Sequence, residues 1–291
     1  MTDSMAIINT LYDKLRFVFD LTPDSVVSRI QSNALDEESS SILLTHVDFY
    51  RSLSESDRLS FNRRVKLFLD TTDVVGNGVE VLNVDRLLVA AGAIIPVWGF
   101  PEWHYFNLQE VILVPGAFNE SSEFGEDDST IQGMVGSGAM SGKMILSQQA
   151  LHYGFSNSQD KRNVAIHEFV HLIDMADGEC DGFPERLTKY AYSIPWFDLV
   201  GRKMQETDET KTNINHYGGT NSVEFLAVVT EYFFERPTMF QRKHAELYKM
   251  LSHFYQQDVA SIKRETKIRK KAPCPCQSGK RYKHCCYPGA L

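Results

Sequence analysis

The sequence predicts an α+β fold in which helices outnumber strands. Apolar residues recur at three- and four-residue spacing over most of the chain, and only two short runs are typical of strands. These two runs alternate irregularly with the helical segments, as in α+β domains. With 291 residues, 43% of them hydrophobic, the chain can bury a substantial core in one large domain or two.

Residues 1–75 are predicted to form a mostly helical lobe. The segments TLYDKLRFVFDL (10–21) and DRLSFNRRVKLFLDTT (57–72) both show helical spacing. Between them, SNALDEESSS (32–41) has the polar composition of a loop. No pattern in this lobe is typical of a site, so we expect it to contribute packing.

The longest apolar run, LLVAAGAIIPVWGF at residues 87–100, is too short for a membrane span and is interrupted by Gly92 and Pro96. We interpret it as a buried helix followed by a turn. Residues 111–114 and 143–146 are the two β-type runs.

Residues 119–142, NESSEFGEDDSTIQGMVGSGAMSG, are rich in serine, glycine and acidic residues. This composition is typical of a mobile loop or an irregular hairpin. Polar residues then precede a helix that is predicted to start near Asn163. A long amphipathic helix is predicted at about residues 239–263.

Charge and cysteine content divide the chain into two parts. The net charge is −8, but nine basic residues and one acidic residue between positions 263 and 286 give that stretch +8 and leave −16 for the rest. Four of the five cysteines also lie in the last eighteen residues. We therefore expect a body, residues 1–265, and a separate tail, residues 266–291. Cys180 alone belongs to the body, where we expect a small packed residue, with a redox role as the alternative.

The pattern with the clearest chemistry is VAIHEFVHLIDMADGE at residues 164–179. Residues four apart lie on one face of a helix, so His167 and His171 can direct ring nitrogens to one point, which is half of a tetrahedral zinc site. Glu168 could reach a metal-bound water without binding the metal. So short a pattern also arises by chance, but its apolar surroundings would bury these polar groups, which then need partners. Asp174 is expected to accept the free ring N–H of a ligand histidine, or else to be a solvated acid at the helix end.

A catalytic zinc needs a third protein ligand. The segment HYGGTNSVEFLAVVTEYFFERP places Glu224 and Glu231 seven residues apart on one face of an otherwise apolar helix. Spacing alone allows either glutamate to be the ligand.

Three segments resemble the Mlc titration factor A family of zinc peptidases: HEFVHLIDMADGECDG, ILVPGAF and YGGTNSVEFLAVVTEYFFERP. The last of them also resembles the catalytic domain of anthrax lethal factor. The resemblance covers about residues 59–258 and little of what precedes them. It implies a zincin fold of the gluzincin type, in which Glu224 is the third ligand, Glu231 lies behind the ligands and Tyr217 stabilises an oxyanion. It also implies a small mixed sheet whose edge strand, residues 143–146, pairs with extended substrate.

We therefore expect a zinc metallopeptidase with aminopeptidase-like activity on peptides or proteins. Zinc held by His167, His171 and Glu224 would lower the pKa of its bound water. Glu168 would take the proton and pass it to the leaving amine, and Tyr217 would donate to the oxyanion. The alternative is a regulatory protein that sequesters a transcriptional repressor, with minor peptidase activity. The presence of Glu168 and Tyr217 favours the enzyme.

The tail contains APCPCQSGKRYKHCC, which resembles the SEC-C motif, a small zinc module. Four thiolates satisfy the tetrahedral demand of a structural zinc. The expected ligands are Cys274, Cys276, Cys285 and Cys286, and His284 could replace the final one. Disulfides are the competing interpretation, but they do not persist in the cytosol. We expect this basic module to dock on an acidic protein surface or, less strongly, on RNA or the ribosome.

The N-terminal segment MTDSMAIINTLYDKLRF lacks the pattern of a signal or transit peptide. We therefore expect a cytoplasmic protein that does not use a membrane as a partner.

Overall fold

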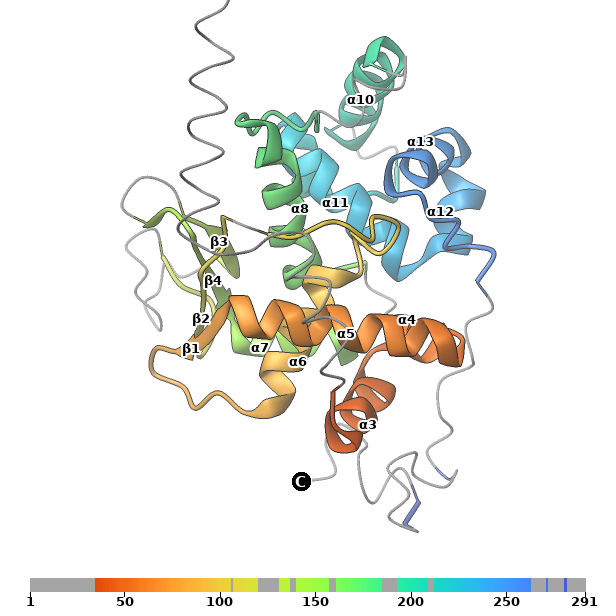
Figure 1. The fold of residues 1–291 in the computed structure, drawn as a ribbon. Helices are drawn as coiled ribbons and strands as arrows, with labels where there is room; N and C mark the ends of the chain where they lie inside the picture. Colours follow the sequence, from red (N-terminus) through yellow and green to blue (C-terminus); the bar gives the residue numbers. More distant parts are fainter. Residues whose placement is uncertain are drawn as a thin grey trace, which may run out of the picture.

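The computed structural model has an α+β fold, as predicted, with a small sheet on one side and helices over the rest (Figure 1). The residues that the structure describes are 35–105, 107–119, 131–136, 140–156, 161–184, 193–208, 212–262, 271, 280 and 281. The elements in chain order are α3 (Glu37–His46), α4 (Asp48–Ser52), α5 (Glu55–Thr71), β1 (Asp73–Gly76), α6 (Asn83–Ile94), β2 (Glu110–Val114), β3 (Gly133–Val135), β4 (Lys143–Ser147), α7 (Gln148–Ser156), α8 (Val164–Asp174), η2 (Met175–Asp177), α10 (Ser193–Asp208), η3 (His216–Gly219), α11 (Ser222–Glu235), α12 (Pro237–Lys243) and α13 (Ala245–Tyr255).

Among the described residues the sheet has four strands in the order β1-β2-β4-β3, with β1, β2 and β4 parallel and β3 antiparallel to β4. The two β-type runs of the sequence are confirmed as β2 and β4. The prediction that residues 143–146 form the edge strand is wrong, because β4 lies between β2 and β3. The physical reason is burial on both faces: Met144 and Leu146 enter the main core, and Ile145 joins a smaller cluster on the other side.

The edge next to β4 is instead β3, which lies within the segment predicted to be a mobile loop or an irregular hairpin. Because β3 pairs with β4, the described part of this segment forms a hairpin and not a loop. A strand of three residues, GMV, offers no alternation that sequence reading could detect.

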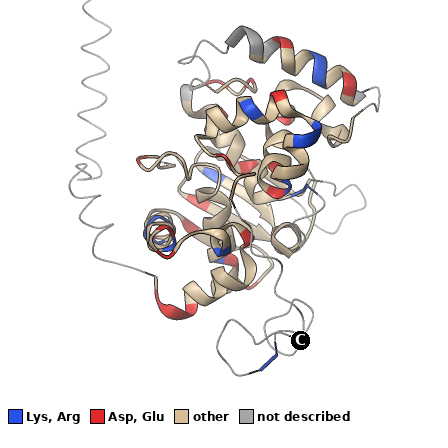
Figure 2. Ribbon diagram, turned by 90° about the vertical axis from the view of Figure 1, so that its right-hand side faces the viewer, with Lys and Arg blue, Asp and Glu red and all other residues tan. Residues whose placement is uncertain are grey.

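Part of the segment predicted to be a loop in the helical lobe is a helix. The loop predicted at residues 32–41 is wrong from residue 37 onward, because α3 starts there. Asp36 caps this helix by accepting from the backbone N–H of Ser39 at 2.7 Å, and the acidic first turn, red in Figure 2, matches the positive end of the helix dipole. The helix predicted at residues 57–72 is confirmed as α5, and the segment at residues 10–21 lies outside the described residues.

The apolar run after α5 is confirmed as a buried helix and a turn. Arg64 is buried and donates to three carbonyl oxygens of residues 97–100 at 2.8–3.1 Å. Gln257, just after α13, donates to the carbonyl oxygens of residues 95 and 96. The turn is therefore held by α5 on one side and by Gln257, just after α13, on the other. No helix of the described residues is long and apolar enough to cross a bilayer.

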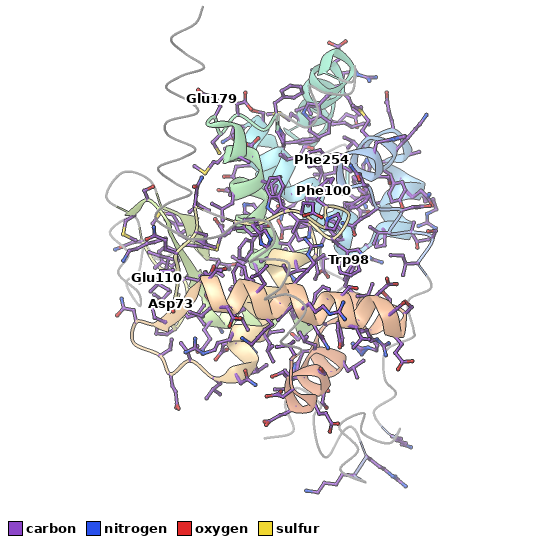
Figure 3. All side chains as sticks on the ribbon, viewed as in Figure 1. Asp73, Trp98, Phe100, Glu110, Glu179 and Phe254 are labelled. Carbon is purple, nitrogen blue, oxygen red and sulfur yellow. The ribbon has the colours of Figure 1, made fainter. Side chains whose placement is uncertain are left out.

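Aromatic rings also connect the turn at residues 97–100 to the lobe and to α13. Phe100 lies beside Phe254 of α13, both labelled in Figure 3, with their ring centroids 6.5 Å apart. The Phe49 and Trp98 rings lie 6.3 Å apart. The described part of the lobe thus shares one core with the C-terminal helices.

The single helix predicted at residues 239–263 is wrong. The structure has two helices, because His244 adopts φ −135° and ψ 54°, which is not helical, and both ends α12 and begins α13. Its Nε2 lies 2.7 Å from Asn213 Oδ1, so the break has a side-chain partner. The second helix ends at Tyr255, where Gln256 takes a left-handed conformation.

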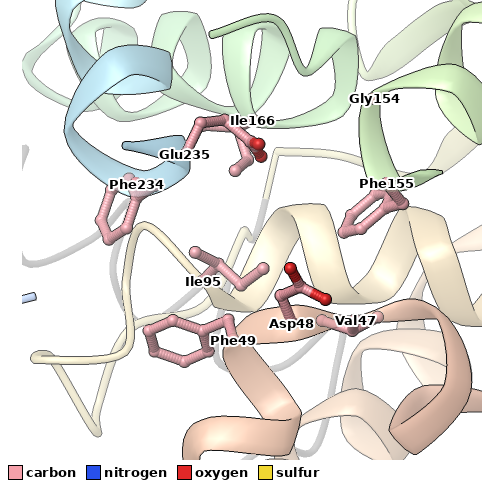
Figure 4. Close-up of a pocket in the computed structure, with 9 residues that line it drawn as sticks. All are labelled: Val47, Asp48, Phe49, Ile95, Gly154, Phe155, Ile166, Phe234 and Glu235. Carbon is pink, nitrogen blue, oxygen red and sulfur yellow. The ribbon is translucent and has the colours of Figure 1, made fainter. Parts of the chain in front are cut away.

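A small cavity lies within the packing between the lobe and the centre of the fold. Figure 4 shows its lining, which includes Phe49, Ile95, Ile166 and Phe234 together with the acidic Asp48 and Glu235. Its volume of about 30 Å³ holds about two water molecules at most. This cavity is therefore too small for a peptide.

Helix α8 lies at the centre, beside α11 (Figure 1), and α6 approaches it closely. Gly92 of α6 faces Ala165 of α8, and a Cβ atom at position 92 would lie 2.4 Å from the Ala165 Cβ. Glycine is needed here for close contact between the helices.

The Gly92→Ala variant should lower the free energy of unfolding by about 1–3 kcal/mol, because the added methyl forces α6 and α8 apart. Gly201→Ala is the matched control: it also lies in a helix, α10, but its added Cβ would meet nothing within 4 Å. Urea denaturation of both variants measures the difference. Equal stabilities would show that the α6–α8 contact tolerates a methyl group.

Candidate metal centre

Helix α8 brings the two predicted histidines together. Asn163 caps it by accepting from the backbone N–H of Ile166 at 3.2 Å, so the predicted helix start is confirmed. The apolar faces of the helix enter the core, which leaves His167 and His171 on the remaining face with 13% and 12% of their side chains exposed. Their ring centroids are 4.8 Å apart.

Helix α11 brings Glu224 to these rings. Asn221 caps the helix and accepts from the backbone N–H of Glu224 at 2.9 Å, which holds Glu224 in the first turn. Glu224 Oε2 lies 3.0 Å from His167 Nε2, and Glu224 Oε1 lies 3.9 Å from His171 Nε2. One carboxylate thus meets the Nε2 atoms of both histidines.

Glu231 lies two helical turns further along, behind the His167 ring. Its Oε1 is 2.8 Å from His167 Nδ1, and its Oε2 accepts from the backbone N–H of Asn163 at 2.5 Å. Spacing alone did not distinguish the two glutamates, but their positions do. Glu224 meets the outward ring nitrogens, whereas Glu231 orients one ring from behind, as outer partners of metal ligands do.

Glu168 is buried beside this group. Burial raises its pKa to about 7, and the charges of Glu224 and Glu231 act in the same direction against an opposing effect from His167. The edge strand β3 passes directly over it: a Cβ atom at Gly133 would lie 2.6 Å from the Glu168 carboxylate. A carboxylate with this pKa beside a strand edge is suited to accept and return a proton near pH 7.

The two histidines have opposite pKa shifts. Burial lowers the pKa of His167, but its hydrogen bonds to Glu224 and Glu231 outweigh this effect and raise the pKa well above its ordinary value. Burial and the charge of His167 lower the pKa of His171 to about 4. A metal cation would take the place of a proton on His167 Nε2 beside Glu224, so metal binding would release that proton.

Tyr217 stands at the open side of this group. Asn215 holds η3 by accepting from the Tyr217 backbone N–H, and the tyrosine ring centroid is 6.2 Å from that of His167. Its side chain is 53% exposed, and its hydroxyl helps to lower the pKa of the Glu224 carboxyl group. Burial of the hydroxyl and the charge of Glu224 raise the pKa of Tyr217, so it remains a proton donor.

Asp174 has a different partner from the one predicted. It is 1% exposed, and its Oδ2 accepts from the backbone N–H of Gly182 at 2.8 Å. Among the described residues it makes no hydrogen bond to His171, whose Nδ1 is buried without a partner there. Sequence spacing could not have found Gly182, because the turn that carries it folds back on the helix.

Cys180 is exposed, so the prediction of a packed residue is wrong. Desolvation of its thiol and the nearby carboxylate of Asp174 raise its pKa to about 12, which makes it a poor nucleophile. The predicted ligands of the tail, Cys274, Cys276, His284, Cys285 and Cys286, lie outside the described residues.

The donor set fits a zinc ion. Ligand atoms about 2.1 Å from a tetrahedral centre are about 3.4 Å apart, and the two distances from Glu224 to the histidines, 3.0 and 3.9 Å, fall on either side of that value. Glu168 also offers an oxygen within 4.8 Å of both histidines. His167 lowers the pKa of Glu224 despite burial, whereas the pKa of Glu168 is raised, so Glu224 is the more readily ionised of the two carboxyl groups.

An α+β fold with two histidines one turn apart on a buried helix, and a glutamate from a second helix, defines a metallopeptidase-like domain. The chain belongs to the family of glucose-regulated metallo-peptidases M90, whose model matches residues 24–256. The match starts well before residue 59, so the expected extent of the resemblance was too short. Residues 271–288 match the SEC-C motif.

Several relatives cover most of this chain. An uncharacterized protein of Synechocystis sp., slr2042, is 31% identical over 226 residues, which is 74% of this chain and 82% of the relative. The Mlc titration factor A of Klebsiella pneumoniae is 26% identical over 238 residues, 75% of this chain and 85% of that protein. The Mlc titration factor A of Cronobacter sakazakii is 29% identical over 220 residues, with coverage of 71% and 81%.

Proposed function

We propose that this protein is a zinc-dependent metallopeptidase of the gluzincin type. The observation that carries the proposal is the meeting of His167 Nε2, His171 Nε2 and the Glu224 carboxylate beside a buried Glu168. Membership in the M90 family agrees with it.

Each residue of the site has a role in peptide hydrolysis. His167, His171 and Glu224 would hold zinc, which when bound lowers the pKa of a water towards about 7 and polarises a carbonyl group. Glu168 accepts the proton of the attacking water on its carboxylate and delivers it to the leaving amine. Tyr217 donates its hydroxyl proton in a hydrogen bond to the developing oxyanion.

Substrate would bind along β3. In the described part of the chain no strand pairs with its outer edge, and Gly133 allows a backbone to pass close to Glu168. Addition of an extended peptide to such an edge is a common mode of recognition. The proposed aminopeptidase-like activity is what the resemblance to the Mlc titration factor A family implies.

The tail, residues 266–291, would form a separate SEC-C module with its own structural zinc. The SEC-C match at residues 271–288 supports this division from the body, residues 1–265. Its basic surface would dock on an acidic protein surface, and RNA is the weaker alternative.

The alternative function is regulation by binding. The name Mlc titration factor A, which several relatives carry, describes a factor that titrates Mlc. The same scaffold could thus act by sequestering a repressor-like partner. Loss of turnover without loss of the cellular role in a Glu168 variant would favour this alternative.

Glu168→Gln should retain zinc and lower kcat by about 10²–10⁴-fold, because the amide cannot accept the proton. Turnover of aminoacyl p-nitroanilides and elemental analysis of the same preparations measure both quantities. His167→Ala is the control that should lose activity and metal together. A Glu168→Gln variant that hydrolyses at the wild-type rate would refute the assignment of the base.

Elemental analysis of the full chain should find two zinc ions. His167→Ala combined with His171→Ala should leave one, and Cys274→Ser combined with Cys276→Ser should also leave one. If the cysteine variant contains no zinc, or if the histidine variant still contains two, the assignment of the two sites is incorrect.

Tyr217→Phe should lower kcat by about 10²-fold with little change in KM or zinc content, since only a transition-state hydrogen bond is removed. Tyr153→Phe is the matched control, because Tyr153 on α7 is also 53% exposed. Equal kcat values for the two variants would remove Tyr217 from the mechanism.

A further inference from the structure

The two helices that carry the proposed metal ligands are joined at both ends. At one end, Glu231 of α11 accepts from the backbone N–H of Asn163, the cap of α8. At the other end, a turn at residues 180–182 lies between the last residue of α8 and the first residue of α11. The proposed ligands lie between these two junctions.

The turn makes specific contacts with three helices. Gly182 donates its N–H to Asp174 of α8 at 2.8 Å and accepts at its carbonyl from Trp196 Nε1 of α10 at 3.2 Å. The hydroxyl of Ser222, in α11, donates to the carbonyl oxygen of Asp181 at 2.6 Å. The turn therefore connects Asp174 to the first turn of α11 through hydrogen bonds, so a change at Asp174 would shift that first turn.

Gly182 is required in this turn for two reasons. Its φ of +77° is a left-handed conformation that favours glycine. A Cβ atom there would also lie 2.3 Å from the carbonyl oxygen of Ser222 and 2.8 Å from the backbone nitrogen of Val223. The turn is thus seated directly on the backbone that precedes Glu224.

We infer that Asp174 is a positioning residue of the metal centre that acts through Gly182 and the first turn of α11, and thereby sets where Glu224 stands relative to His167 and His171. This inference rests on the proposed function, because it assumes that these three residues bind zinc. Asp174 lies one helical turn after His171 on α8. If the turn at residues 180–182 shifts, Glu224 therefore moves while His171 stays in place, and the distance between the two changes. A role through the backbone of Gly182 requires an oxygen acceptor at position 174, but it does not require a charge.

Two glycine variants test the close contact between the turn at residues 180–182 and the backbone of α11. Gly182→Ala should weaken zinc binding at the histidine site by about 10–100-fold and change the visible absorption of Co²⁺ bound there. Gly178→Ala is the matched control: it carries the same kind of strain, with φ +103°, but its added Cβ would meet nothing within 4 Å. It should bind zinc nearly as the wild type does. Equal affinities for the two variants would overturn the inference.

Two variants of Asp174 test how it acts. Asp174→Asn keeps an oxygen that can accept from Gly182, so its zinc affinity and Co²⁺ spectrum should stay near those of the wild type. Asp174→Ala removes the acceptor and should weaken binding as Gly182→Ala does. If the asparagine variant binds as weakly as the alanine variant, the charge of Asp174 acts on the site directly and the inference is wrong.

Chelator competition on the full chain measures these affinities, with the combined His167→Ala and His171→Ala variant subtracted to remove zinc bound elsewhere. A wild-type protein with no zinc attributable to the two histidines would overturn the proposed function itself. Zinc binding in the wild type with no loss in Gly182→Ala would overturn only the positioning role.

Discussion

The carboxylate of Glu231 is the constraint on which the rest of the site depends. It joins α11 to α8 twice, through the backbone N–H of Asn163 and through His167 Nδ1, and it does so in a buried place where a lost partner is costly. Because Glu231 holds the His167 ring from behind, Nε2 is left to face Glu224. The direction of one ring therefore follows from the antiparallel packing of two helices.

Close packing around α8 is achieved through glycines on three neighbouring elements. Gly92 of α6 lies against Ala165, Gly154 of α7 against Asn163, and Gly133 of β3 against Glu168. At each position a Cβ atom would come closer than 3.0 Å to the helix or to its side chains. The face of α8 that bears the histidines is left to α11 and to the open side of the site, while β3 packs over Glu168.

The same burial has opposite consequences for two glutamates. Burial raises the pKa of Glu168 to about 7, whereas the hydrogen bond from His167 holds the pKa of Glu224 low. Groups whose surroundings move their pKa values apart commonly divide the work of a site between them. A proton-accepting role for Glu168 and a ligand role for Glu224 are consistent with that division.

The sequence by itself determined the α+β class, the helix with its two histidines and glutamate, and the two inner strands, because these depend on local spacing and apolar content. Only the tertiary structure decided that β3 and not β4 forms the strand edge, that Glu224 and Glu231 occupy different sides of His167, and that Asp174 pairs with Gly182. Each of these three features depends on contacts between segments that are distant along the chain, or on a turn that folds back. A periodic pattern in the sequence specifies which face of a helix is buried, but it does not specify which residues lie opposite that face.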